Sequence, residues 1–160
     1  MARDAAALLL RVVAGLIFLP HGWAKVMGEG GSAAFAADMA ANYGIPSLLG
    51  HLAAWAELGG AILLIAGLFT RVDAFLLAAT MFVAAFVVQL PDALFEVPAN
   101  AIRAFAAIRG IETPLAMFAI SAALVLTGGG RFSLDHLLAG VLGKKKAAAE
   151  AAAAHVSSVL

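Results

Sequence analysis

Four long apolar stretches constrain this chain more than any other feature of its sequence. A membrane-spanning helix needs about 20 mostly apolar residues. The stretches of that length are Ala5–Met27, Leu48–Phe69, Val72–Leu90 and Ile111–Thr127. Of the 160 residues, 64% are apolar and 12% are charged, which is too few polar groups to cover a soluble domain of this size. We therefore expect an all-α integral membrane protein, a four-helix bundle, and exclude a soluble enzyme or a disordered chain.

The two connections on the side away from the termini contain helical patterns of their own. Ser32–Asn42 is rich in alanine, carries Phe35 and Met39 four residues apart, and begins with a residue type that favours the N-cap. Ala99–Ile108 gathers its apolar residues on one side of a helix. We expect both segments to form short helices on the outer membrane surface.

The basic residues between the spans predict the orientation of the bundle. With four spans, both termini and the turn between the second and third spans share one side. That side carries six basic residues, which are Arg3, Arg71, Arg131, Lys144, Lys145 and Lys146. The opposite side carries three, which are Lys25, Arg103 and Arg109. Because cytoplasmic loops are enriched in Lys and Arg, we expect both termini to be cytoplasmic.

The sequence divides into a transmembrane domain over residues 1–136 and an Ala/Lys-rich cytoplasmic tail over residues 137–160. We interpret the first span as a retained helix, because it is long for a signal peptide and no small-x-small cleavage site follows Pro20. The segment Lys144–Ala154 is an Ala-rich helix former behind a basic triplet. We interpret it as a cytoplasmic stop signal in preference to a lipid-recognition site.

Ionisable side chains inside the spans mark the candidate site, since such charges are costly in lipid and are usually paired or functional. His21 and Lys25 are four residues apart and share a face near the outer end of the first span. Glu57, in the antiparallel second span, reaches a similar depth and can meet either of them. We expect a ligand-binding or proton-handling site formed by His21, Lys25, Glu57 and Trp55. The indole of Trp55 is typical of an interfacial anchor and could also stack on a ligand.

Three interpretations of these groups remain open from the residues alone. A carboxylate shielded from water holds its proton more tightly and a neighbouring cation reverses this, which suits coupled proton and electron chemistry at a quinone headgroup. The same groups could form a structural ion pair that fixes the first helix to the second. His21 and His51 could instead be axial ligands of a haem. His51 lies at the mouth of its span, so we expect a quinone in preference to haem.

A second set of charged residues is expected to form structural ion pairs at the cytoplasmic end. Its members are Arg11, Arg71, Arg131 and Asp135. Arg11 lies inside the first span and is expected either to reach the cytoplasmic face along its apolar stem or to pair with Asp135 or Asp73. Both outcomes are structural.

The composition excludes several other functions. The chain has no cysteine, so thiolate metal sites, iron–sulfur clusters and thiol redox chemistry are excluded within it, and we expect no metal site. Ten Lys and Arg balance ten Asp and Glu, so no basic field favours nucleic acid.

Several motifs resemble those of the DoxX family of membrane proteins. The matching segments, in chain order, are Leu8–Phe18 followed by His21-Gly22 and Lys25, then Ala56–Gly60, then Gly67–Arg71, and finally Gly130–Asp135. They are similar to the family's first helix, its second motif, the turn after it, and its C-terminal signature. The resemblance covers most of the chain, from about residue 8 to residue 135.

The resemblance implies a four-helix protein of the DoxX/DoxD group, located in the bacterial inner membrane. Members are associated with redox complexes, including a small subunit of thiosulfate:quinone oxidoreductase, and with oxidative-stress or oxidative biosynthesis systems. The residues that match family motif positions, without an agreed catalytic role, are His21, Lys25, Glu57, Arg71, Arg131 and Asp135. Some redox relatives use cysteine partners, and this chain has none.

We therefore expect a redox-associated, quinone-linked subunit of a membrane oxidoreductase system, in contact with lipid and with a protein partner. The alternative is a non-catalytic structural or assembly subunit of a larger membrane complex. The sequence leaves open whether the chain is itself an enzyme and whether it forms a homo-oligomer.

Overall fold

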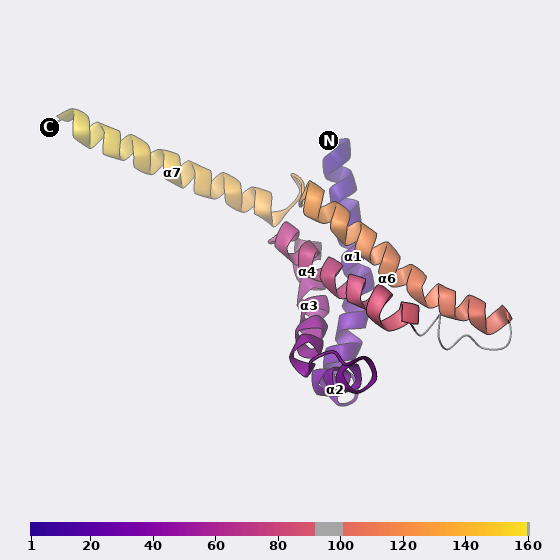
Figure 1. Cartoon of the computed structure of the whole chain (residues 1–160). Coiled ribbons are helices and arrows are strands. Elements are labelled where there is room, and N and C mark those ends of the chain that lie inside the picture. The colour runs from indigo at the N-terminus through magenta and orange to yellow at the C-terminus, as the bar shows by residue number, and fades with distance from the viewer. Residues whose placement is uncertain (92–100, 160) are drawn as a thin grey trace.

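The computed structural model describes residues 1–91 and 101–159, and of residues 101–108 and 147–159 it describes the backbone alone. The described residues form helices and no strands (Figure 1). In chain order these are α1 (Ala2–Met27), α2 (Gly31–Tyr43), α3 (Ser47–Ala66), α4 (Thr70–Val83), the π-helix η1 (Ala84–Gln89), α6 (Ala101–Thr127) and α7 (Leu134–Val159).

Four helical segments are long and apolar enough to cross a membrane, which confirms the expected fold class. They are Ala2–Met27, Ser47–Ala66, Thr70–Gln89 and Arg109–Thr127. The third is α4 continued by η1, so its last turns are a π-helix that the apolar pattern did not predict. The remaining boundaries differ from the predicted ones by a few residues, as expected for helix ends.

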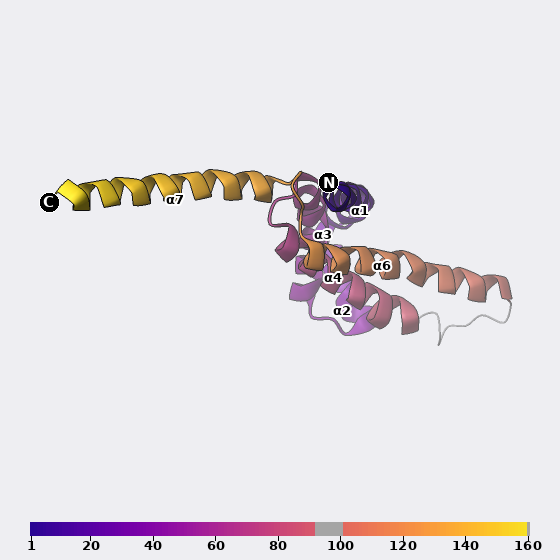
Figure 2. The same cartoon turned by 90° about the horizontal axis from the view of Figure 1, so that it is seen from above.

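The four spans pack as two pairs, α1 with α3 and α4 with α6, and α3 also contacts α4. Figure 2, which looks along α1, shows α4 and α6 running obliquely past the first pair. The N-terminus, the turn from α3 to α4 and the start of α7 lie at one end of the bundle, which we name the terminal end (Figure 1). The short helix α2 lies at the other end, which we name the α2 end. That the terminal end faces the cytoplasm stays a prediction.

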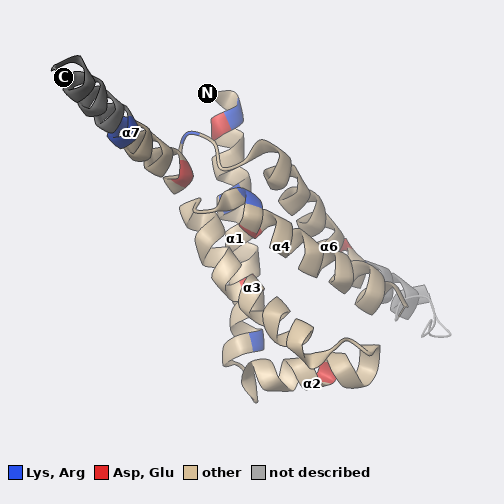
Figure 3. Ribbon diagram, turned by 60° about the vertical axis from the view of Figure 1, so that its left-hand side comes forward, with Lys and Arg blue, Asp and Glu red and all other residues tan. Residues whose placement is uncertain are grey.

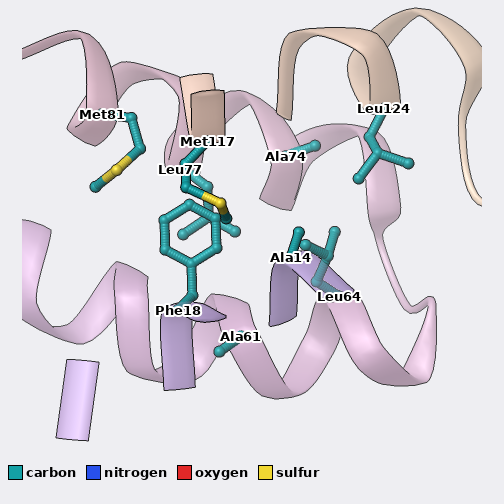
Figure 4. Packing of buried hydrophobic residues seen from close by; sticks show 9 residues of the cluster. All are labelled: Ala14, Phe18, Ala61, Leu64, Ala74, Leu77, Met81, Met117 and Leu124. Atoms are coloured by element: carbon teal, nitrogen blue, oxygen red, sulfur yellow. The ribbon is translucent and has the colours of Figure 1, made fainter. Parts of the chain in front are cut away.

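The centre of the bundle is a small apolar core in which the helices meet. Phe18 of α1 points toward Leu77 of α4 and Met117 of α6 (Figure 4). The other buried members of the cluster are Ala14, Ala61, Leu64, Ala74, Met81 and Leu124. Most large apolar side chains elsewhere are exposed on the outside of the bundle. This arrangement is typical of a protein whose outer surface faces lipid.

Glycines let α1 and α3 approach at backbone distance. A Cβ placed on Gly22 would overlap the backbone of Leu58 and Glu57, and one placed on Gly15 would meet the carbonyl oxygen of Ala61. Because apolar side chains gain little by leaving lipid for a helix interface, such close contacts supply much of the association between spans. The small residues therefore permit the close packing of α1 against α3.

The expected short helix in the first connection is present as α2, although its start differs. The N-cap is Gly30 in a left-handed conformation, φ 74°, and not Ser32. The Ser32 hydroxyl lies instead 3.1 Å from His51 Nδ1, which joins α2 to the beginning of α3.

The second expected short helix is not a separate element. Residues 99 and 100 lie outside the described part of the chain, and residues 101–108 are the first turns of α6, which continues to Thr127. Gly110 does not break the helix, since a glycine inside a helix costs only about 1 kcal/mol relative to alanine. The expected domain boundary at residue 136 falls inside α7, which leaves the bundle sideways (Figures 1 and 2).

Candidate functional site

Lys25 of α1 and Glu57 of α3 form an ion pair at the α2 end of the bundle. Lys25 Nζ lies 2.5 Å from Glu57 Oε1, and the two side chains are 25% and 2% exposed. Gly22, almost one turn before Lys25, allows α1 to touch the backbone of Glu57. This close crossing places the ammonium directly over the buried carboxylate. Of the two partners that the helix register allowed for Glu57, the structure therefore selects Lys25.

The Glu57 carboxylate is satisfied at only one of its oxygens. Oε2 is buried and has no hydrogen-bond partner among the described residues. A buried polar atom of this kind is uncommon in a folded protein and points to a strained or functional position. The Lys25 ammonium also lies 4.8 Å from the centre of the Phe35 ring of α2, which is a cation–π distance. Three helices thus converge on one charged group.

An open hollow of about 420 Å³ lies beside the ion pair, and its size falls in the range of small-molecule sites. It is lined by Pro20, His21, Ala24, Lys25, Glu29, Gly31 and Phe35. Lys25 both lines the hollow and bonds the carboxylate, so it connects the hollow to Glu57. His21, one turn earlier on the same face of α1, opens onto the same hollow. The structure thereby brings together three of the predicted site residues.

Trp55 is not brought to this pair. Its side chain is 53% exposed, and it stands two residues before Glu57 on α3, about 200° away around the helix. The indole therefore projects from nearly the opposite face, as an outward-facing anchor would. Across the described residues, no group of three His, Cys, Asp or Glu side chains is placed to hold a metal ion.

Arg11 lies at the terminal end and is completely buried, 0% exposed. Its Nη2 donates a hydrogen bond of 2.8 Å to the carbonyl oxygen of Phe132. The guanidinium lies under the loop after α6, against Gly67, where any Cβ would overlap it. That Arg11 reaches the cytoplasmic face of the membrane along its stem stays a prediction. Gly67 also adopts φ 72° as the C-cap of α3, so glycine serves two needs there.

Asp135 caps the N-terminus of α4. The N–H of Phe69 donates to Asp135 Oδ1 at 2.6 Å and the N–H of Thr70 donates to Oδ2 at 2.8 Å. Phe69 has a left-handed backbone, φ 51°, which is a strained conformation for a bulky residue. The two hydrogen bonds to Asp135 help to hold it. Burial raises the pKa of Asp135, but these N–H donors and the nearby Arg11 charge outweigh it and hold the pKa below its ordinary value.

The predicted ion pairs at the terminal end are replaced by bonds between charged groups and the backbone. None of the three arginines forms a direct ion pair with a carboxylate of the described residues. Arg71 Nη2 lies 3.4 Å from the carbonyl oxygen of Leu126, and the backbone N–H of Arg131 donates to Asp4 Oδ1 at 3.0 Å. Helix ends and loops contain backbone groups that need partners, and the charged side chains supply them.

Asp73, which the sequence predicted only as a partner for Arg11, is a further buried polar residue at the terminal end. Asp73 lies in the first turn of α4, is buried, and has no hydrogen-bond partner for its Oδ2 within the described residues. Thr70, one turn earlier, is also buried. Two polar residues three apart at the start of a span were a signal that could have found this position. Figure 3 shows that the charged residues are few and lie far apart along the ribbon of the bundle.

Comparisons with known proteins agree with the resemblance in the sequence. The family model described as DoxX matches residues 6–90. A protein of Bacillus subtilis (strain 168) named "Putative oxidoreductase CatD" is 39% identical over 83 residues, which are 52% of this chain and 59% of that protein. The chain thus spans less than two thirds of the length of this relative. No solved structure gives a significant match.

Proposed function

The chain belongs to the DoxX family, and from that premise we propose that it is a redox-associated membrane subunit that holds a quinone-class molecule beside Lys25 and Glu57. The name of the Bacillus subtilis relative supports the redox association. The observation that carries the proposal is the buried Glu57 carboxylate, with Oε1 bound by Lys25 and Oε2 without a partner in the described part of the chain.

The residues around the hollow fit the headgroup of a quinone. A quinone ring has carbonyl oxygens that accept hydrogen bonds, and the Lys25 ammonium and the His21 imidazole are donors on the hollow. Pro20, Ala24 and Phe35 supply apolar surface for a ring. When bound, a quinone takes up electrons together with protons and releases both on oxidation.

The part of the chain in this chemistry is to hold and move protons. Lys25 is the more exposed partner of the ion pair. Its Nζ exchanges protons with the molecule bound in the hollow. Glu57 is 2% exposed, so the Lys25 ammonium is the group that carries a proton between Oε1 and the hollow. The Glu57 side chain, including Oε2, is buried in the bundle and so is shielded from bulk water. Charges in such a site interact more strongly than they would in water.

Native mass spectrometry tests the proposal directly. The protein is expressed in a quinone-containing bacterium, extracted in mild detergent and weighed with its bound molecules. We expect an adduct with the mass of the host quinone on the wild-type protein and its loss in Glu57→Gln. Glu112→Gln is the matched control, because Glu112 is an exposed carboxylate on α6. Retention of the adduct in Glu57→Gln would contradict the proposal.

A second candidate function is that of a non-catalytic assembly subunit. The observation in its favour is that the Lys25–Glu57 pair lies at the contact between α1 and α3 and can fix these helices without any ligand. The same spectrum separates the two. A stoichiometric protein partner without a small-molecule adduct would favour assembly and contradict the quinone proposal.

A further inference from the structure

The first half of α7 carries an exposed apolar stripe. The large apolar residues of this segment follow the spacing i, i+3, i+4, i+7 and i+8, and are Leu134, Leu137, Leu138, Val141 and Leu142. Their exposed fractions run from 42% to 63%. Asp135 lies at one edge of the stripe, and small or polar residues occupy the opposite face, at His136, Ala139, Gly140 and Gly143. This pattern is that of a helix with one apolar side.

The described bundle does not cover this stripe. α7 is joined to the bundle at its base, where Asp135 bonds the N-terminus of α4. Beyond the base, α7 runs crosswise to α1 and away from the other helices, as Figures 1 and 2 both show. In Figure 1, α7 rises from its base toward the level of the N-terminus, so it leaves the bundle sideways at the terminal end and does not run back beside the spans.

The position of α7 along the chain brings it to the membrane boundary. The fourth span ends at Thr127 and α7 begins at Leu134, after one short loop. Asp135 fixes that loop against the turn between α3 and α4. The stripe therefore begins at the level where the spans leave the hydrocarbon.

Three consecutive lysines come directly after the stripe in the sequence, at Lys144, Lys145 and Lys146. On a helix, Lys144 and Lys146 fall on the two flanks of the apolar face, where long stems can lie along apolar surface and ammonium groups can reach headgroups. A basic cluster beside an apolar helix face is complementary to a membrane surface that contains anionic lipid.

We propose that residues 134–146 form an interfacial helix that inserts its leucine stripe into the membrane at the terminal end and binds anionic lipid headgroups through Lys144–Lys146. The apolar stripe, the crosswise direction and the flanking lysines together favour a lipid surface over a protein groove. This segment is therefore part of the membrane-bound body of the protein and not the start of a free tail.

Site-directed spin labelling tests this proposal well, because the chain has no cysteine of its own. Single variants Leu137→Cys and Val141→Cys place a nitroxide on the stripe, and Ala139→Cys and Gly143→Cys place one on the opposite face as matched controls. The full chain is reconstituted in vesicles of phosphatidylcholine with phosphatidylglycerol. Collision with oxygen, which partitions into lipid, is compared with collision with a water-soluble nickel chelate.

We expect the ratio of oxygen to nickel collisions to be several-fold higher at the stripe positions than at the controls. Replacing the three lysines with glutamine, or omitting phosphatidylglycerol, should lower the ratio at the stripe. Equal and water-like ratios on both faces would overturn the proposal. So would a stripe shielded from both reagents, which would indicate a protein partner or a second copy, and so would a ratio insensitive to both lipid charge and the lysine variant.

Discussion

Gly22→Ala is the substitution for which the structure makes the sharpest prediction. The added methyl carbon would overlap the Leu58 backbone nitrogen and lie 2.6 Å from Leu58 Cα, whereas ordinary contact begins at 3.4 Å. The atoms on the other side belong to the backbone of α3, so no side-chain rotation can relieve the overlap. We therefore expect α1 and α3 to separate by about 0.8 Å or more, in the range where a gap of ~0.5–1 Å already forfeits a quarter to a half of the dispersion attraction.

Two costs follow from this separation. Overfilling a packed interface typically costs ~1–3 kcal/mol. Moving Lys25 away from Glu57 weakens the one hydrogen bond that the described residues make to this buried carboxylate, and the loss of a buried pair costs up to ~3–5 kcal/mol when it is complete. Because the long lysine stem can follow part of the shift, we expect Gly22→Ala to lower the free energy of unfolding by about 2–4 kcal/mol.

The chain provides a matched control for this experiment in Gly59→Ala. Gly59 also lies inside a span, but a Cβ there would meet nothing within 4 Å. Its replacement should leave the free energy of unfolding unchanged or raise it by up to ~1 kcal/mol through helix propensity. Both variants are unfolded by adding sodium dodecyl sulfate to mild micelles, with tryptophan fluorescence as the readout. Equal stability of the two would refute the close helix contact and the pairing that depends on it.

Further predictions follow from the same geometry and use the same unfolding assay unless stated. Gly67→Ala should destabilise by clearly more than Gly44→Ala, because both glycines have positive φ but only Gly67 lies against a buried guanidinium. Asp135→Ala should cost ~0.5–2 kcal/mol as the loss of a helix cap. Because the pKa of Asp135 is lowered in the folded protein, its carboxylate stabilises the fold fully above the unfolded pKa of about 3.9. This contribution is lost as the pH falls through the folded pKa. The variant lacks the carboxylate, so its stability should depend less on pH in the acid range. Lys25→Gln should destabilise by ~3–5 kcal/mol, and adding Glu57→Gln should restore most of that loss.

The spans were predictable because membrane insertion depends on length and apolarity, which are local properties of the sequence. The Lys25–Glu57 contact was predictable as one of two pairings, since depth follows from the rise per residue in two antiparallel helices. The place of Arg11 was not predictable in this way. It depends on Gly67 leaving room and on the Phe132 carbonyl coming within reach, and both are tertiary contacts between distant segments.

The loop between α6 and α7, residues 128–133, also has consequences for how the protein is made. Synthesis proceeds from the N-terminus, so α1, α3 and α4 are complete before Phe132 and Asp135 exist. Until those residues emerge from the ribosome, the Arg11 guanidinium has no Phe132 carbonyl to bond and α4 has no cap. A nascent chain that stops within this loop already contains every span. It still lacks the hydrogen bond from Arg11 of α1 to Phe132 and the cap that Asp135 provides for α4. The contacts that join these helices at the terminal end can therefore form only after residues 132–135 have been made, later than all four spans.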